Sequence, residues 1–319
     1  MAGRISLISI IIPTLNGGEL FAEVLKGIGR QQLDEEYELL VYDSASTDNT
    51  VATARTFGAK VVSIGREDFD HGSTRTLAAE QARGDILIFM TQDAVPADTV
   101  ALKKLTAPFA DREDIAATYG RQLPAPDADI FAAHLRLHNY PGTSAVRCWQ
   151  DRKTYGFKTV FISNSFAAWR RDVLAGHGFF PARQLFGEDT CALANLLENG
   201  YCVAYVSEAR VYHSHNYSPV QDFRRYFDIG VFHACHSDML EKFGSPTGAG
   251  KQFVRSETAY LRQQKKYLRL PESIFRSGAK FIAYQLGKRY KKLPKNLPPL
   301  LSLHRRWWST DAVLSGNQS

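Results

Sequence analysis

Short hydrophobic runs alternate with amphipathic stretches along the first hundred residues of the chain. Uninterrupted apolar runs are typical of strands buried on both faces of a sheet, whereas apolar residues three to four positions apart indicate helices. The runs predict strands at residues 6–13, 37–42, 60–64 and 85–90. The amphipathic stretches predict helices at residues 20–28, 50–57, 73–82 and 98–109. This regular alternation predicts an α/β fold with a mostly parallel, doubly wound sheet.

The pattern becomes less regular in the second third of the chain. Further strands are predicted at residues 119–123, 160–169 and 203–212, and helices at residues 170–175 and 188–199. Residues 130–160 mix aromatic, His and Arg side chains without a clear period, so no element is predicted there. From Val220 onward the pattern is helical.

Composition describes an ordinary globular protein, with 44% hydrophobic and 23% charged residues. No apolar run approaches the length of a membrane-spanning helix, and the N-terminus lacks a signal-peptide pattern. We therefore expect the protein in the cytosol or on the cytoplasmic side of a membrane. The four cysteines are widely spaced and form no Cys-x-x-Cys pair, which favours buried, reduced thiols over a zinc site or a disulfide framework.

Polar residues stand where the first two predicted strands end. Pro13 and Thr14 end the first strand, and Asp43 ends the second. In open α/β folds ligands bind at the carboxyl edge of the sheet, where a carboxylate accepts hydrogen bonds from a ribose or a base. The alternative is a capping turn, because Ser, Thr and Asp dominate residues 43–48.

A possible metal site comes from residues that follow two other strands. Asp93 comes after the strand at residues 85–90, and a lone carboxylate there suits a divalent cation that takes further ligands from a phosphorylated substrate. His213 and His215 follow the strand at residues 203–212, and imidazole can complete a metal shell that begins with a carboxylate. The alternatives are a helix N-cap for Asp93 and structural roles for the histidines.

Charged residues also stand at the starts of two predicted helices. Arg75, after His71, would lie in a first helical turn that attracts anions and would suit a diphosphate, or else would pair at the surface with Glu80 or Asp85. Glu188 and Asp189 begin the helix at residues 188–199, where the helix dipole alone favours acids. Because adjacent carboxylates point in different directions, one can orient a group while the other acts as a base.

Four segments taken together resemble the family 2 glycosyltransferases, which have the GT-A fold. They are Ser9-Ile-Ile-Ile-Pro-Thr-Leu-Asn16, Val41-Tyr-Asp-Ser-Ala-Ser-Thr-Asp-Asn-Thr50, Gly84-Asp-Ile-Leu-Ile-Phe-Met-Thr-Gln-Asp-Ala94 and Phe186-Gly-Glu-Asp189. The usual Asp-x-Asp is replaced by Gln92-Asp93-Ala94. With His71-Gly-x-x-Arg75 and His213-Ser-His-Asn-Tyr217, this variant resembles the bacterial rhamnosyltransferase branch.

The resemblance implies an enzyme that transfers L-rhamnose from dTDP-L-rhamnose, with inversion, to a saccharide acceptor, lipid-linked, in bacterial surface polysaccharide synthesis. Asp189 is the expected base, beside Glu188. The expected donor-binding residues are Pro13, Thr14, Asn16, Asp43, Ser44, His71, Arg75, Gln92 and Asp93. Mg²⁺ or Mn²⁺ is expected on Asp93 with His213 or His215, and Gln92 is expected to hydrogen-bond near the metal. The expected acceptor-binding residues are Trp149, Tyr155, Asn164 and Ser165.

Two alternatives stay open, a UDP-hexose donor and a non-catalytic protein that binds a sugar nucleotide. Ala94 cannot supply the motif's last carboxylate, and Ser44-Ala45 replaces the commoner Asp-Gly. The expected domains are a GT-A catalytic domain at residues 1–232 and a basic helical extension at residues 233–319. Residues 1–125 would form the nucleotide-sugar half of the catalytic domain, and residues 126–232 the acceptor half.

The extension is strongly basic. Residues 265–306 hold twelve Lys or Arg and one acid, Glu272, so their net charge is +11 against +6 for the whole chain. Phe275, Ala279, Ile282 and Leu286 recur at helical spacing, and Trp307-Trp308 follow two arginines. This pattern predicts peripheral attachment to an anionic inner leaflet. The alternatives are packing on the catalytic domain, a homo-oligomer, and, last, nucleic acid, for which no recognition motif is present.

Overall fold

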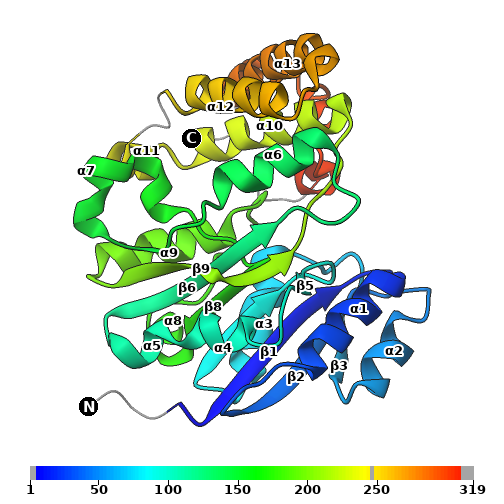
Figure 1. The fold of residues 1–319 in the computed structure, drawn as a ribbon, viewed down its shortest axis with the longest axis vertical. Coiled ribbons are helices and arrows are strands. Elements are labelled where there is room, and N and C mark those ends of the chain that lie inside the picture. The colour runs from blue at the N-terminus through cyan, green and yellow to red at the C-terminus, as the bar shows by residue number, and fades with distance from the viewer. Residues whose placement is uncertain (1–4, 245–247, 310–319) are drawn as a thin grey trace.

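A nine-stranded mixed sheet forms the centre of the protein in the computed structural model, which describes residues 5–244 and 248–309 (Figure 1). The strand order is β3-β2-β1-β4-β8-β6-β9-β5, and β7 pairs with β9. The strands are β1 Leu7–Thr14, β2 Glu36–Asp43, β3 Lys60–Ser63, β4 Ile86–Met90, β5 Val95–Pro96, β6 Ile115–Leu123, β7 Ala145–Cys148, β8 Phe166–Arg170 and β9 Cys202–Tyr212. Six of them run in one direction, and β5, β7 and β8 oppose them. The expected α/β fold with a mostly parallel sheet is confirmed.

The first half of the sheet is built from parallel strands with helical connections. The connecting helices are α1 Gly18–Gly29, α2 Thr50–Thr56 and α3 His71–Gln81. The parallel register places Thr14 of β1 directly beside Asp43 of β2. Both residues therefore end at the same carboxyl edge, as the order of strands and polar residues predicts.

The second half departs from the expected elements in three places. The helix expected at residues 98–109 is split into α4 Ala101–Thr106 and α5 Pro108–Asp111, because Pro108 has no N–H to continue the first helix. A helix that the pattern did not predict, α6 Ile130–Asn139, begins where the Asp129 carboxylate accepts from the N–H groups of Phe131 and Ala132. The strand expected at residues 160–169 begins only at Phe166, since residues 156–160 form a 3₁₀ turn.

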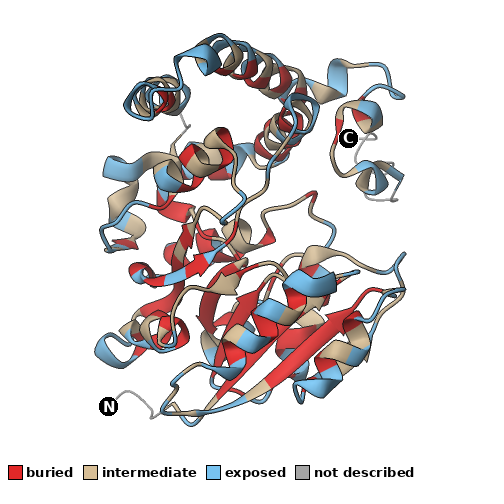
Figure 2. Cartoon of the chain, turned by 45° about the vertical axis from the view of Figure 1, so that its right-hand side comes forward, coloured by how far each residue is buried: buried red, intermediate tan, exposed pale blue. Residues whose placement is uncertain are grey.

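Apolar side chains fill both faces of the sheet. Figure 2 shows that buried residues concentrate on the strands, while exposed residues lie mainly on the surrounding helices. Trp169 of β8 and Phe89 of β4 are fully buried and each packs edge-to-face on Phe180. The remaining helices of this half are α7 Arg152–Tyr155, α8 Arg171–Gly176 and α9 Glu188–Glu198.

The carboxyl-terminal part of the described chain is mostly helical. They are α10 Pro219–Cys235, α11 Ser237–Phe243, α12 Ala249–Gln263, α13 Leu270–Lys288 and α14 Pro298–Leu301. α10 and α13 cross closely at Gly230 and Gly287, where a Cβ on either glycine would meet backbone atoms of the other helix. α10 runs through residue 232, so one continuous helix joins the expected extension to the catalytic half. Within residues 5–244 and 248–309, no helix is long and apolar enough to cross a membrane.

The tryptophan pair at residues 307 and 308 packs against the protein itself. The Trp307 Nε1–H donates to the carbonyl of Arg183 (2.9 Å), and the Trp308 ring lies 5.6 Å from the ring of Tyr290. Both indoles pack against the protein's own apolar cluster around Phe227. Their position at a membrane surface stays a prediction, and the structure shows them partly buried against the protein itself.

Candidate functional site

The Asp43 carboxylate organises the loops at the carboxyl ends of β1 and β2. Its Oδ1 accepts from the Thr14 hydroxyl (3.1 Å) and its Oδ2 from the Ser46 N–H (2.9 Å), and the residue is 2% exposed. The Ser44 N–H donates to the Thr14 carbonyl (2.9 Å), while the Ser44 hydroxyl is buried without a protein partner. Pro13 precedes this contact at the edge of the sheet. The four residues meet as predicted, and the unpartnered hydroxyl leaves one polar group for a ligand.

Two residues of these loops adopt left-handed backbone conformations. Asn16 has φ +49° and Ala45 has φ +58°. The Asn16 Oδ1 accepts from the Thr47 N–H (2.8 Å), which ties the two loops together. A left-handed residue costs about 1–2 kcal/mol unless it is glycine. This explains why glycine is the commoner residue at position 45 in the family resemblance.

Gln92 holds the first loop in place. Its Oε1 accepts from the Leu15 N–H (2.8 Å) and its Nε2 donates to the Leu15 carbonyl (3.1 Å). One N–H of the amide and one lone pair of its oxygen are used by this backbone pair, and a hydrogen bond from Gln92 near the metal stays a prediction. Ala94 is fully buried among apolar residues, so a carboxylate at that position would be taken into the core.

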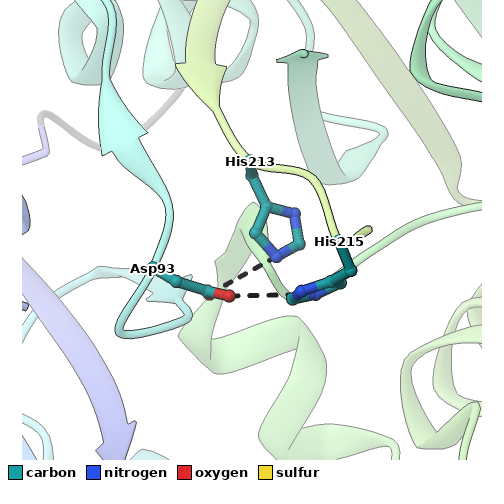
Figure 3. A group of neighbouring side chains, drawn as sticks. All are labelled: Asp93, His213 and His215. Atoms are coloured by element: carbon teal, nitrogen blue, oxygen red, sulfur yellow. Dashed lines mark ion pairs between the residues drawn. The ribbon is translucent and has the colours of Figure 1, made fainter. Parts of the chain in front are cut away.

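Asp93, His213 and His215 converge on one point, with the two imidazoles directed at the carboxylate (Figure 3). The Asp93 oxygens lie 3.3 Å from His213 Nε2 and 3.8 Å from His215 Nε2. The ligand atoms lie within 4.8 Å of one another, which is close enough to share one cation. The sequence-predicted metal residues are thus brought together.

Strand β5 is what closes this cluster. β4 and β9 are separated in the sheet by β8 and β6, yet the chain leaves β4, turns at Asp93 and returns as β5 along β9. Val95 pairs with Tyr212, the residue before His213. The two-residue antiparallel pairing therefore sets the carboxylate against the histidines.

Two residues that the sequence reasoning missed orient His213. The Gln122 Oε1 accepts from Arg136 Nη1 (2.6 Å), so this atom is the amide oxygen and accepts from His213 Nδ1 at 2.9 Å. Because Nδ1 carries the proton, the lone pair of Nε2 points at the Asp93 oxygen, and two lone pairs repel each other. A second proton or a metal ion must therefore lie between Nε2 and the Asp93 oxygen, as in other metal sites where an outer partner fixes the tautomer of a histidine ligand. The sequence offers one hint of this contact, because the polar residue Gln122 stands near the carboxyl end of strand β6.

The ionisation states fit a metal site. Burial opposes ionisation of Asp93, but hydrogen bonding and the charge of His213 prevail and hold the pKa of this carboxyl well below its usual range. Burial and the neighbouring His213 lower the pKa of His215 to about 4. At neutral pH the cluster therefore presents a carboxylate and at least one neutral imidazole, and both are ligand forms.

Glu188 and Asp189 begin α9, and Arg75 of α3 lies against them. Arg75 Nη1 donates to Glu188 Oε1 at 2.7 Å, with both side chains 6% exposed. Arg75 therefore pairs with neither Glu80 nor Asp85, and its guanidinium is directed at Glu188. Its role in binding the donor diphosphate stays a prediction. The arrangement assigns Glu188 to an ion pair and leaves Asp189 available as a base.

Asp189 is held by backbone donors in a poorly solvated position. Its Oδ2 accepts from the Asn164 N–H (3.0 Å) and its Oδ1 from the Thr190 N–H (2.7 Å). Burial and the adjacent Glu188 carboxylate raise the pKa of Asp189 to about 7. A carboxyl group with such a pKa is suited to accept a proton at neutral pH.

The predicted acceptor residues differ in whether a ligand could reach them. Asn164 is 2% exposed, and its Oδ1 accepts from the Trp169 indole (2.8 Å), so its side chain holds the loop whose backbone contacts Asp189. Ser165 is partly exposed, and its carbonyl accepts from the Thr91 N–H (3.3 Å). Trp149 packs edge-to-face on Phe243, whereas Tyr155 is 45% exposed. Of these residues, Ser165 and Tyr155 are best placed to reach a ligand.

Residues 163–165 connect the metal cluster to the carboxylate pair. Ser163 accepts from Gln122 Nε2 (3.3 Å), on the side of His213, and Asn164 donates to Asp189. The two groups of chemistry-bearing residues are therefore neighbours across one loop.

His71 lies between Arg75 and a large open cavity. Burial and the Arg75 guanidinium lower the pKa of His71, so its Nδ1 accepts from Arg75 Nη1 at 3.2 Å. The cavity, of about 970 Å³, is lined by His71, Asp70, Arg183, His304 and Arg306 among others. It does not include Asp93 or Asp189, so it adjoins the site without containing it.

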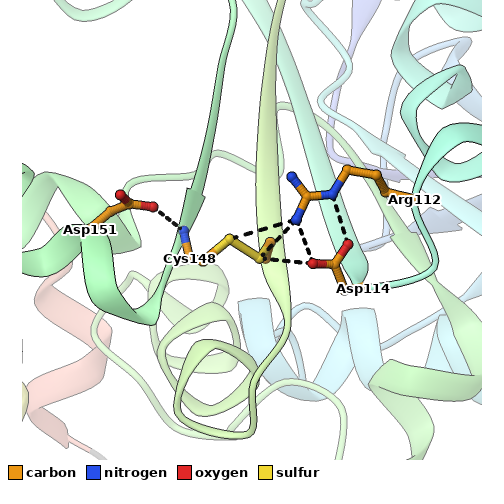
Figure 4. The surroundings of a disulfide bond; sticks show 5 residues. Arg112, Asp114, Cys148 and Asp151 are labelled. Atoms are coloured by element: carbon orange, nitrogen blue, oxygen red, sulfur yellow. Dashed lines mark hydrogen bonds and ion pairs between the residues drawn. A yellow bond between two sulfur atoms is a disulfide. The ribbon is translucent and has the colours of Figure 1, made fainter.

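Cys148 and Cys202 form a disulfide between β7 and β9 (Figure 4), so the expectation of four reduced thiols is wrong for this pair. The antiparallel register sets the two residues opposite each other, although 54 residues separate them in sequence. Arg112 Nη2 lies 3.7 Å from Cys202 Sγ. The bond links the end of β7, just before Trp149, to the start of β9. The free cysteines are Cys191 and Cys235.

Comparison with known proteins supports the resemblance to family 2 glycosyltransferases. The model of the family "Glycosyl transferase family 2" matches residues 9–178. The chain is 42% identical over 304 residues to the O-antigen chain rhamnosyltransferase RfbN of Salmonella typhimurium, covering 95% of this chain and 96% of the relative. It is 38% identical to the O-antigen chain rhamnosyltransferase WbaN of Salmonella anatum, covering 94% and 95%.

Solved structures share the fold. A mannosyltransferase from Pyrobaculum calidifontis, in complex with GDP-Man and Mn²⁺, superposes with a TM-score of 0.59 at 17% identity, covering 98% of this chain and 87% of that one. Staphylococcus aureus TarS 1–349 superposes with a TM-score of 0.54 at 20% identity, covering 98% and 92%. Together with the matched motifs, these likenesses identify the sheet as the GT-A fold. The chain therefore belongs to glycosyl transferase family 2, in the branch that contains the two Salmonella rhamnosyltransferases.

Proposed function

We propose that this glycosyltransferase moves L-rhamnose from dTDP-L-rhamnose to a saccharide acceptor, with inversion at the anomeric carbon. The observation that carries the proposal is the pairing of a cation-binding cluster at Asp93 with a carboxyl group of raised pKa at Asp189, across the single loop 163–165. The names of the two Salmonella relatives, which cover nearly the whole chain, support rhamnose as the transferred sugar and O-antigen as the product.

The donor would bind at the carboxyl edge formed by β1, β2 and β4. Asp43 and the unpartnered Ser44 hydroxyl are suited to a nucleoside, because both lie where the loops after β1 and β2 meet. Asp93, His213 and His215 would hold a divalent ion, which would neutralise charge on the diphosphate leaving group. Two imidazole ligands favour Mn²⁺ over Mg²⁺, because Mg²⁺ takes oxygen ligands almost exclusively.

The transfer itself would depend on Asp189. The acceptor hydroxyl attacks the anomeric carbon while Asp189 takes its proton, and the bond from that carbon to the diphosphate oxygen breaks. A positioned general base contributes about 10²–10⁴ in rate. Arg75 holds Glu188 as a compensated ion pair, so that only one of the two adjacent carboxylates competes for the proton.

The names of the relatives, and not a pocket, suggest the acceptor class, a saccharide of an O-antigen chain. We propose that this saccharide is lipid-linked and that the enzyme works at the cytoplasmic face of a membrane. Tyr155 and Ser165 are the exposed or partly exposed residues of the predicted acceptor set that would reach it.

Donor binding by calorimetry tests the proposal. We expect dTDP-L-rhamnose to bind more tightly than UDP-glucose, and to bind at least tenfold more weakly when EDTA removes the metal or when Asp93→Ala removes its acidic ligand. Asp98→Ala, at a carboxylate that pairs with Arg210 outside the site, is the matched control. Preference for the UDP-sugar would support a hexosyltransferase instead. Tight donor binding without turnover on any saccharide would support a non-catalytic protein.

A further inference from the structure

The outward side of α13 exposes four large apolar side chains. Ile274 is 68% exposed, Phe275 66%, Phe281 64% and Ile282 56%. At about 100° per residue these four side chains fall within about 120° of one another around the helix axis. Gly278 lies in the middle of that arc with open space around it. We call these four residues the α13 apolar face.

The inward side of the same helix carries buried charges beside small residues such as Ala283 and Gly287. Arg276 and Lys280 are buried, and both pair with the buried carboxylate of Asp222 on α10, at 2.9 and 3.3 Å. A surface helix of a globular protein normally turns its apolar stripe to the core and its charges to water. α13 instead buries two cations and leaves four large apolar side chains mostly exposed, so its apolar face is largely unpacked by the described residues of this chain.

Positive charge flanks the α13 apolar face at both ends. Lys265, Lys266 and Arg269 are exposed just before the helix, together with Leu268, which is 96% exposed. At the other end the exposed cations are Lys288, Arg289, Lys291 and Lys292. The single acid of residues 265–306, Glu272, is paired with Arg269 and Arg276.

Two partners could cover the α13 apolar face, a second copy of this chain or a lipid surface, and the charge distribution favours one of them. A second copy docked face to face would bring seven cations of each chain together, and like charges across an interface oppose association. An anionic lipid surface matches both features, because apolar side chains enter the boundary between headgroups and acyl chains while Lys and Arg reach back to the headgroups. This match does not depend on Trp307 and Trp308, which are partly buried against the protein.

We propose that the α13 apolar face and its flanking cations dock this enzyme on an anionic membrane. α12 and α13 lie at one end of the molecule and β2 and β3 at the other (Figure 1), so the docking surface is separate from the first strands of the sheet. This surface is compatible with a lipid-linked acceptor, but it rests on α13 alone and not on the donor or the metal.

Vesicle co-sedimentation without any sugar substrate tests the docking. The full chain is mixed with vesicles of phosphatidylcholine alone or with added phosphatidylglycerol, at low and high salt. We expect binding to the anionic vesicles only, reduced by salt because exposed charges are screened. Replacing all four residues of the α13 apolar face by Ser, or Lys288, Lys291 and Lys292 by Gln, should each weaken binding at least about tenfold.

Matched substitutions elsewhere on the surface serve as controls. Val220→Ser changes an apolar side chain that is 60% exposed on α10, and the double change Arg55→Gln, Lys60→Gln removes two exposed cations of the nucleotide half. Both should bind vesicles like the wild type. Circular dichroism and donor binding, unchanged in all variants, show that the fold is kept.

Two results would overturn the proposal. One is wild-type protein that does not sediment with anionic vesicles, or whose binding survives both α13 variants. The other is a dimer, seen by analytical ultracentrifugation, that the Ser variant converts to a monomer without loss of vesicle binding, which would assign the face to a second copy. Failure of rhamnose transfer, by contrast, would leave vesicle binding unaffected.

Discussion

The substitution Asp189→Asn should lower turnover and, at alkaline pH, raise stability. The two effects have different origins. Turnover depends on a base that accepts the acceptor's proton, and its loss should reduce kcat about 10²–10⁴-fold. Stability depends on the cost of ionising a poorly solvated carboxyl group beside Glu188, a cost that asparagine does not carry.

The size of the stability effect follows from the pKa of Asp189, which is raised to about 7. A raised carboxyl pKa means that the folded state binds the proton more tightly, so wild-type stability falls as pH rises from about 4 to about 7. Three units correspond to about 4 kcal/mol as an upper limit, and partial exposure of Asp189 reduces this to about 2 kcal/mol. Asparagine can accept only one of the two N–H donors from Asn164 and Thr190, which costs about 1 kcal/mol.

The balance changes sign with pH. At pH 8 the Asn variant should be about 1 kcal/mol more stable than the wild type. Near pH 4, where Asp189 is protonated in the folded state and largely so in the unfolded state, it should be less stable by up to about 1 kcal/mol. Thermal unfolding at both pH values measures the difference, and dTDP release measures turnover, which in the wild type should rise with pH around 7. Asp172→Asn, at an exposed carboxylate of α8, is the control for both assays. Full turnover by Asp189→Asn, or a stability difference that does not vary with pH, would refute the reasoning.

Three further outcomes follow from buried contacts. Arg75→Met should cost about 3–5 kcal/mol in urea unfolding, because it leaves the Glu188 carboxylate buried without a counter-charge, and should move the rise of turnover to higher pH, because Arg75 lowers the pKa of Asp189. Asp222→Ala should cost about as much, because it removes the carboxylate partner of the buried Lys280 and leaves the buried Arg276 with Glu272 alone; a loss below about 1 kcal/mol would contradict the buried pairing. Thiol titration of the denatured, unreduced protein should find two reactive thiols per chain, and four would show that Cys148 and Cys202 are reduced.

The nucleotide-binding half could be predicted closely because its information is local. Each strand is an uninterrupted apolar run, each helix has its own periodicity, and a parallel register brings the strand ends Thr14 and Asp43 to one edge without further knowledge. The same argument placed Asp93 and the His213–His215 pair at strand ends. Glu188-Asp189 was recognisable because two adjacent acids begin a helix.

The sequence by itself thus determined the fold class, the order of the strands' polar ends and the residue types available for chemistry. Only the tertiary structure decided which of them meet. The contact of Asp93 with His213 depends on β5 returning to β9, and the pairing of Arg75 with Glu188 joins residues 113 positions apart. Cys148 meets Cys202 through strand register, and α13 faces inward with its charges because Asp222 stabilises them there. Each of these contacts joins distant segments of the chain, and local pattern carries no signal for such pairings.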